Sequence, residues 1–459
     1  MPEGVKANDT RPAEEQVGPS MHNANGPQGG AKPKLDKFAY GFWAPEMAPF
    51  RKVAAKILIG TVVITTVVMW LCLPLYWGSL WKSNHYTDRL TVRVIDRDGG
   101  AIGQAITQAL LAETNLRYFS TPPSEFPTNA EVAHDVVQEG TWGAIVISEG
   151  ATLALQTARA IGNASYNGSS AVEVFYAQAR QETAVGSYLL PYMQVALAEI
   201  TGRLSAQSVA QYLSENAGNQ TAINALAQAP TTVSNCIFFT LNNLRPYNQP
   251  VAAAITLVGL IYMLIFAFIL TMSGSAVREI ISPFMTTRSY IIYRLATPML
   301  LYLPISFFFA MINLPFKIHF DAHYTYAGGF FLWAFTLYLG MAAVGLATEF
   351  AITILPQKFV SFFLVPWIIV NVSVAVMPHE LQPWIYRYGA AMPFFNAGRV
   401  VRTIIFDTKN DIAKNLGILL GWIGFSFVTI SLATWLTRRN SVNEHRREMA
   451  AKRLDQEKL

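Results

Sequence analysis

Long uncharged hydrophobic stretches are the dominant pattern along the chain. The first, Lys56 to Trp77, follows 55 mostly polar residues, whereas a cleavable secretory signal lies at the very N-terminus behind a short basic region. About 20 apolar residues suffice to cross a hydrocarbon core roughly 30 Å thick. We therefore expect a retained transmembrane helix at 56–77, preceded by a disordered cytoplasmic tail at 1–55.

Five more hydrophobic stretches follow, all in the C-terminal half. They are too long and too continuous for the strands of a membrane barrel, and prolines in two of them are tolerated where neighbouring helices satisfy the freed backbone groups. The pattern predicts an α-helical polytopic membrane protein with six transmembrane helices in a one-plus-five arrangement. The five later spans are predicted at 251–272, 295–314, 328–348, 359–377 and 416–436.

Between the first and second spans, residues 78–250 follow a different pattern of alternating strands and helices. Leu90 to Gly100 is typical of a strand ending in an acidic turn, and Ala101 to Glu113 of a helix. Further strands are predicted in WGAIVISEG and AVEVFYA, a short helix around EVAHDVVQEG, and a long helical region from Arg180 to about Glu215. We expect an inserted extracytoplasmic mixed α/β domain with its own core.

Composition and charge agree with this class and set an orientation. Only 14% of the residues are charged and 52% are hydrophobic, where soluble domains have roughly a quarter charged residues. Lys and Arg precede the first span, lie between the second and third, and follow the sixth in a basic tail at 437–459, so both termini are predicted to be cytoplasmic. The discordant segment is 378–415, whose basic residues fall on the outer side; either it is a structured outer element or the fifth span is misplaced.

Cysteines and glycosylation motifs bear on the outer domain. Only Cys72 and Cys236 are present, one inside the first span, so the domain must be held by its core. Asn-x-Ser/Thr motifs place candidate glycosylation sites in that domain. These sites are Asn163, Asn167 and Asn219, while Asn8 falls in the predicted tail and Asn371 in a predicted span.

Several motifs resemble known membrane proteins. VRVIDRDGGAIGQAI and WGAIVISEGATLAL are similar to paired motifs in the outer domains of type-2 ABC permease-like and phage-infection-protein-like proteins. FWAPEMAPFRK, VEVFYAQARQETAVGSYLLPYM and the five-helix C-terminal half resemble the fungal nitrosoguanidine-resistance membrane protein family (DUF3533) over residues 40–437. The resemblance implies a plasma-membrane protein linked to resistance to toxic compounds, through export or phospholipid distribution, and implies no catalytic residues.

Nucleotide, metal and hydrolase motifs are missing from the sequence, so we expect no cofactor, no metal and no enzymatic activity. Any ATP would be bound by another polypeptide, and a separate ATPase or a regulatory protein is an expected partner. Membrane lipids and a homodimer are the other expected partners. The net charge of +5 lies mainly in the tails and fits topology and anionic lipid contact better than nucleic-acid binding.

Two pairs of charged residues are candidate sites. Arg399 and Arg402 lie one turn apart on a predicted amphipathic, interfacial helix, where they contact lipid phosphate or an anionic substrate, or simply anchor the helix. Arg278 and Glu279 follow the second span in a predicted cytoplasmic docking loop of the kind that receives an ATPase in the resembled permeases. The alternative for that pair is an interfacial ion pair that supports topology.

Three weaker features have ordinary interpretations. Glu349, at the end of the fourth span, is either a proton or substrate contact or, as we favour, a solvated group near the interface. The HFDAH segment at 319–323 is interpreted as a polar loop, although its histidines have metal-ligand spacing. Gly417, Gly421 and Gly424 form a small face on the sixth span that would allow close helix contact.

Two functional hypotheses remain open from the sequence. The first is a permease-like protein that exports toxic compounds or moves phospholipid between leaflets. The alternative is a non-transporting membrane scaffold or sensor that acts through its outer domain. A membrane enzyme is disfavoured because no nucleophile and base occur at a telling spacing.

Overall fold

The structure, a computed structural model, describes residues 39–456. Contacts divide the chain into two compact units, residues 1–64 and 65–459, and helix α1 (Ala48–Leu80) runs through the boundary after a 3-10 turn at Pro45–Met47. The part of α1 up to Ile64 exposes a run of aliphatic side chains, as expected for a helix surrounded by lipid. Most of the predicted disordered tail, residues 1–38, and the Asn8 motif lie outside the described residues.

A five-stranded mixed sheet forms the centre of the α/β domain, residues 83–249. The strand order is β2-β1-β3-β4-β5; β1 pairs in parallel with β2 and β3, β4 runs antiparallel to β3, and β5 is parallel to β4. This confirms the predicted small mixed sheet, although the pattern missed β2 and β5, which are short or polar. The strands are β1 (Thr91–Asp96), β2 (Arg117–Ser120), β3 (Gly143–Ile147), β4 (Val172–Tyr176) and β5 (Phe239–Asn243).

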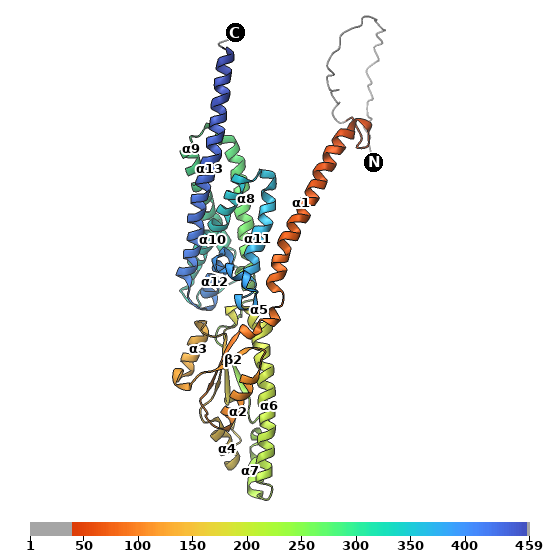
Figure 1. The fold of residues 1–459 in the computed structure, drawn as a ribbon. Coiled ribbons are helices and arrows are strands. Elements are labelled where there is room, and N and C mark those ends of the chain that lie inside the picture. Colours follow the sequence, from red (N-terminus) through yellow and green to blue (C-terminus); the bar gives the residue numbers. More distant parts are fainter. Residues whose placement is uncertain (1–38, 457–459) are drawn as a thin grey trace, which may run out of the picture. The chain divides into compact units, whose positions relative to one another are not determined.

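Helices cover both faces of the sheet, so the strands are apolar on both sides (Figure 1). On one face, Val92 and Val94 of β1 share a core with α2 (Ala101–Ala112), α4 (Ala151–Ile161) and α6 (Leu190–Glu215). On the other, α3 contributes Val132 and Val136 to a smaller core. The remaining helices are α3 (Asn129–Val137), α5 (Glu182–Ala184) and α7 (Gln220–Gln228).

The acidic turn after β1 holds two helix starts together. Asp98 accepts hydrogen bonds from the backbone N–H and hydroxyl of Thr152 on α4, at 2.9 and 2.5 Å, and from the N–H of Gly103 on α2. A carboxylate at two helix N-termini satisfies otherwise unpaired N–H groups and the helix dipoles. The DRDGG motif is therefore structural, joining β1, α2 and α4.

The helical domain, residues 254–456, contains helices α8 to α13, which lie side by side (Figure 1). Within residues 39–456, five helices are long and apolar enough to cross a membrane, α1, α8, α9, α10 and α13. The predicted fifth span at 359–377 is the shorter α11, so six spans remain a prediction. The bounds are α8 (Gly259–Ile281, after a π turn at Ala254–Val258), α9 (Thr287–Met311), α10 (Tyr326–Ile354), α11 (Val360–Ala375), α12 (Pro393–Phe406) and α13 (Ile412–Gln456).

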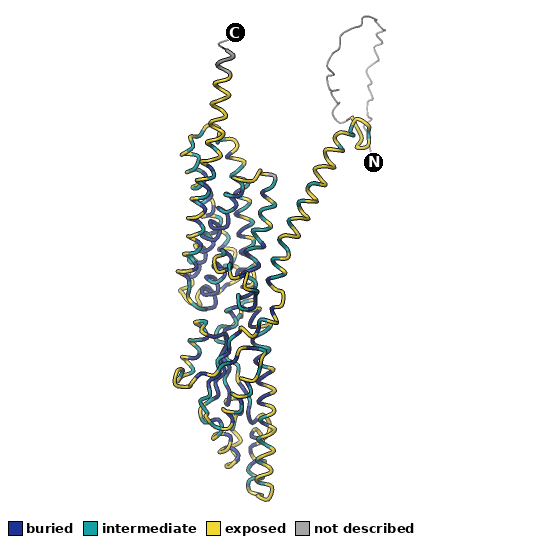
Figure 2. Tube along the Cα trace, in the orientation of Figure 1, coloured by how far each residue is buried: buried dark blue, intermediate teal, exposed yellow. Residues whose placement is uncertain are grey.

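The centre of this domain is α10, which is buried along most of its length (Figure 2). Helix α12 packs against α10, α11 and α13, and twelve of its 14 residues are buried. The prediction of an interfacial helix here is therefore wrong: the discordant segment 378–415 folds into two 3-10 turns, His379–Leu381 and Trp384–Ala391, and this core helix.

Helix α13 continues beyond the predicted end of the last span. The pattern placed a separate basic tail after residue 436, but α13 runs to Gln456 with its polar end exposed (Figure 2). The charges change along this helix while its backbone does not, because Lys, Arg, Glu and Ala are all good helix formers.

Candidate functional site

The α/β domain is joined to α12 by ion pairs. Arg399 Nη2 lies 2.8 Å from Oε2 of Glu139, which follows α3, and 3.2 Å from Oδ2 of Asp411. Arg402 pairs with Glu182 at the start of α5 and also donates to the carbonyl of Ala179. Both arginines that the sequence singled out therefore reach protein carboxylates at the junction of the two domains.

A third pair extends this junction. Arg245, after β5, donates to the carbonyl and the carboxylate of Asp407, at 2.5 Å each. Asp407 ends α12 in a left-handed conformation, with φ of 52°, and also contacts His323. His323 of the HFDAH segment is thus engaged by a carboxylate, and the described residues contain no group of three side chains suited to hold a metal.

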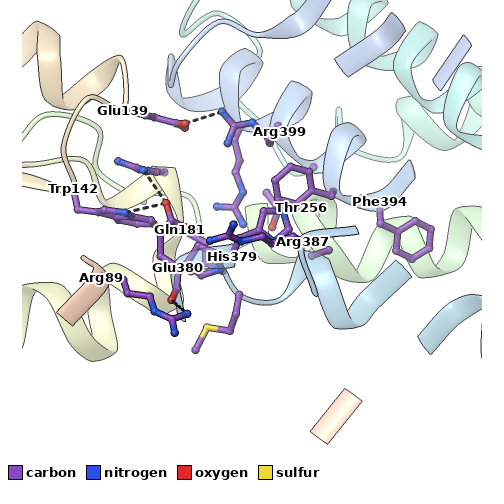
Figure 3. Close-up of a pocket in the computed structure, with 17 residues that line it drawn as sticks. Arg89, Glu139, Trp142, Gln181, Thr256, His379, Glu380, Arg387, Phe394 and Arg399 are labelled. Atoms are coloured by element: carbon purple, nitrogen blue, oxygen red, sulfur yellow. Dashed lines mark hydrogen bonds and ion pairs between the residues drawn. The ribbon is translucent and has the colours of Figure 1, made fainter. Parts of the chain in front are cut away.

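A cavity of about 470 Å³ opens at this junction (Figure 3). Its size is in the range of small-molecule sites. The walls combine cations with apolar and aromatic groups, and two carboxylates accompany five guanidinium groups. The charged residues that line it are Arg89, Arg180, Arg387, Arg399, Arg402, Glu139 and Glu380, and among the apolar ones are Trp142, Met377, Phe394 and Phe395.

Most of these cations are already engaged by the protein. Arg180 lies 3.7 Å from Glu380, donates to the carbonyl of Thr141 and stacks on Trp142. Burial lowers the pKa of Arg180 from its ordinary value, and Glu139 and Glu380 partly offset that effect. Its ordinary pKa is so high that the guanidinium stays charged at neutral pH.

Arg387 differs from the other four arginines. It is exposed at the cavity wall, in the 3-10 turn before α12, and makes no hydrogen bond, ion pair or aromatic contact with any residue from 39 to 456. Arg89 bonds only to carbonyl oxygens, those of Glu380 and Gln382, and stacks on Tyr86. These two cations have no carboxylate partner within the described residues, so the cavity suits an anionic group.

His379 adds a shielded, uncharged ring. It stacks on Phe395 with ring centroids 4.7 Å apart, and both ring nitrogens are buried without a hydrogen-bond partner among the described residues. Burial lowers the pKa of His379 below its ordinary value, so the ring is neutral at pH 7.

A second charged cluster lies within the helical domain. Glu349 of α10 is 1% exposed, with Oε1 2.9 Å from Arg278 Nη1 of α8 and Oε2 3.3 Å from Arg294 Nη2 of α9. Arg294 also donates to Thr353 and to Thr434 of α13. The favoured interpretation of Glu349 as a solvated group is therefore wrong; the carboxylate ties three helices together.

Of the predicted docking pair, Arg278 and Glu279, only Arg278 belongs to this cluster. Arg278 and Glu279 both lie in the last turn of α8 rather than in a loop, with Arg278 buried against Glu349 and Glu279 exposed. The two residues point different ways because neighbours on a helix are about 100° apart. Docking of a separate ATPase at this end stays a prediction.

The predicted glycosylation sites lie on the surface of the α/β domain. Asn163, Asn167 and Asn219 are exposed, and each side-chain oxygen accepts a bond from a nearby backbone N–H. Asn371, by contrast, is fully buried and bonded to Trp367 and Phe394. The glycine face at 417, 421 and 424 is exposed, with open space beside each glycine.

Comparison with known proteins identifies the family. A family described as a protein of unknown function, DUF3533, matches residues 61–428. The chain belongs to this family. The match covers the α/β domain and most of the helical domain, and it carries no link to nitrosoguanidine resistance or to ABC permeases.

A relative of this chain is described as a membrane protein. The chain is similar to an uncharacterized endoplasmic reticulum membrane protein of Saccharomyces cerevisiae, with 23% identity over 84% of this chain and 81% of the relative. No solved structure matches. These findings support a membrane protein of an uncharacterized family, while the predicted plasma-membrane location and cytoplasmic termini remain predictions.

Sequence reasoning missed most of the cavity. Glu139, Arg180 and Arg89 come from turns and loops of the α/β domain. No sequence motif predicted that they would line a cavity with α12. Arg387 had a usable signal, because it lies in the segment whose positive charge violated the expected side preference. The basic residues on the predicted outer side indicated that segment 378–415 is unusual, but the sequence pattern could not identify the residues that contact them.

Proposed function

We propose that this protein binds amphipathic anions in the junction cavity and moves them in the membrane, as an exporter of toxic compounds or a mover of phospholipid between leaflets. The single observation that carries the proposal is the unpaired Arg387 in a cavity of about 470 Å³ at the contact of the two domains. A charged side chain held there without a partner among the described residues, beside aromatic and aliphatic side chains in the cavity wall, matches a ligand with an anionic group and an apolar body.

The position of the cavity supports transport over simple storage. Its walls come both from the α/β domain and from α12, and α12 is packed against α10, the central helix of the helical domain. A ligand that displaces Glu139 from Arg399 would loosen a contact between the domains, so binding and domain movement are coupled in this proposal.

The location proposed is a membrane of the secretory route, with the α/β domain on the non-cytosolic side. The basic flanks of the spans favour this orientation. The yeast relative is described as an endoplasmic reticulum membrane protein. The endoplasmic reticulum and the plasma membrane are therefore the two locations to test.

The test compares cells without the protein, cells with the intact protein, and cells with the Arg387→Gln or the Arg203→Gln variant. Arg203 is an exposed arginine of α6 outside the cavity, so its variant matches the charge change. Fluorescent phospholipids with anionic headgroups and a panel of fluorescent lipophilic anions are followed across the membrane. Movement that requires the protein, falls about tenfold with Arg387→Gln and is kept by Arg203→Gln is the expected result.

Two outcomes would reject the proposal. Equal movement with and without the protein, despite altered sensitivity to toxic compounds, would favour the scaffold or sensor. The same loss in both variants would show that the cavity has no special role.

A further inference from the structure

A second cationic cavity lies at the far ends of α8, α9, α10 and α13, away from the junction. It has a volume of about 610 Å³. Its walls carry Arg294, Arg438 and Arg446 together with the hydroxyls of Thr353, Thr437 and Ser441. None of the described residues that line it is acidic, so its electrostatic preference is for an anion.

Two arginines in the wall of this cavity have buried N–H groups without partners among the described residues. Arg294 is only 4% exposed, and its Nε is buried without a hydrogen-bond partner, as is the Nε of Arg438. Buried N–H groups left without acceptors are costly. Arg294 is fixed in place by Glu349, Thr353 and Thr434, so its guanidinium is held at a fixed position in the cavity wall.

A groove continues from the cavity between α9 and α13; near the cavity it is mixed, because Arg288 and Arg439 also line it, and farther along it is mainly apolar. A neighbouring space of about 690 Å³ shares Val442 and Arg446 with the cavity and adds Ile292 and Trp435. Ile291 and Trp435 then line a further space of about 650 Å³ with Phe427 and Val428. Cations at one end and an aliphatic groove along the spans match a headgroup and an acyl chain.

We infer that this cavity binds the phosphate group of an anionic phospholipid, with one acyl chain in the groove between α9 and α13. Arg446, which has no partner among the described residues, and the Nη1 group of Arg438 supply donors for phosphate oxygens, while the hydroxyls donate to backbone carbonyls of their own helices. A soluble phosphate shares this chemistry but would leave the groove unused. The inference does not rest on the junction cavity and stands if the proposed transport fails.

The test titrates full-length protein in detergent with dioleoylphosphatidate and, separately, dioleoylphosphatidylcholine, and counts bound lipid by native mass spectrometry. Arg446→Gln removes an exposed cavity arginine with no partner among residues 39–456, and Arg447→Gln removes the adjacent exposed arginine, which does not line the cavity. We expect phosphatidate to bind about tenfold more weakly to Arg446→Gln and unchanged to Arg447→Gln.

Two further arms decide the source and guard against a folding defect. Ser441→Leu fills the cavity wall without a charge change and should also weaken phosphatidate binding. Inorganic phosphate is added as competitor: displacement at low millimolar concentration would assign the site to soluble phosphate, and no displacement assigns it to lipid. Equal weakening by Arg446→Gln and Arg447→Gln, or full binding to Ser441→Leu, would overturn the inference.

Discussion

Arg399 of α12 and Glu139 of the α/β domain lie 260 positions apart in the chain, and their side chains meet at 2.8 Å. Both are partly shielded, with side-chain exposures of 27% and 16%. The pair therefore joins the two domains through a charge-assisted hydrogen bond in an environment drier than the open surface.

The coupling between these two residues is measurable. A double-mutant cycle with Arg399→Gln and Glu139→Gln should give a coupling of about 1–3 kcal/mol in the free energy of unfolding in detergent. Glu199 and Arg203, exposed residues one turn apart on α6 and outside the junction, are the control and should give less than about 1 kcal/mol. Equal coupling for both pairs would contradict a special role for the junction.

Glu349 should be far more sensitive than the arginines around it. Glu349→Gln leaves two buried guanidinium groups without a counter-charge, and such losses cost about 3–5 kcal/mol. Arg278→Gln should cost less, because it leaves one cation paired with one carboxylate. Glu279→Gln, on the exposed side of the same turn of α8, should have almost no effect.

Thermal unfolding and monodispersity in detergent would rank the three variants. The expected order of destabilisation is Glu349→Gln, then Arg278→Gln, then Glu279→Gln. A result in which Arg278→Gln is the most damaging would show that the cluster is held by something other than its single carboxylate.

Asp98 should make the α/β domain sensitive to acid. Burial acts to raise the pKa of Asp98, but the bonds from Thr152 and Gly103 outweigh it and hold the pKa below its ordinary value. Because the pKa of Asp98 is lower in the folded state, its charge stabilises the fold when the pH is above the ordinary pKa range of Asp. This stabilisation is lost as the pH falls below about 4.

Asp98→Asn should therefore lower the unfolding temperature at pH 7, with a loss of about 1–2 kcal/mol, and the difference from the native chain should shrink near pH 3. Asp88→Asn, an exposed control before β1, should show no such change. A difference that stays constant with pH would mean that the carboxylate charge is irrelevant at this turn.

Glycosylation would report which side of the membrane holds the α/β domain. In a eukaryotic host, expression should give a protein whose electrophoretic mobility rises after endoglycosidase treatment, with steps lost one at a time on changing Asn163, Asn167 and Asn219 to Gln. Asn371→Gln should change no step, because Asn371 is buried. Absence of modification on all three, with the domain protected from externally added protease, would reverse the orientation.

Helices and strands with a clear periodicity of hydrophobic residues could be predicted from the sequence. The contacts between these elements could not. The strand at β1, the helix at α2 and the long apolar spans follow from local patterning. Glu349 was misinterpreted because its partners, Arg278 and Arg294, come from two other helices. Helix α12 was misinterpreted for the same reason: its arginines gave it an amphipathic pattern, but their partners lie in a domain more than 200 residues earlier.

The length of α11 has a consequence for the surrounding lipid. Sixteen residues rise about 24 Å, against a hydrocarbon thickness of roughly 30 Å. If α11 is the predicted fifth span, the bilayer beside it must thin or polar groups must be drawn inward. Under the proposed function, a thinner bilayer would shorten the distance that a headgroup travels, and the neighbourhood of α11 would then be where lipid exchange between leaflets meets its lowest barrier.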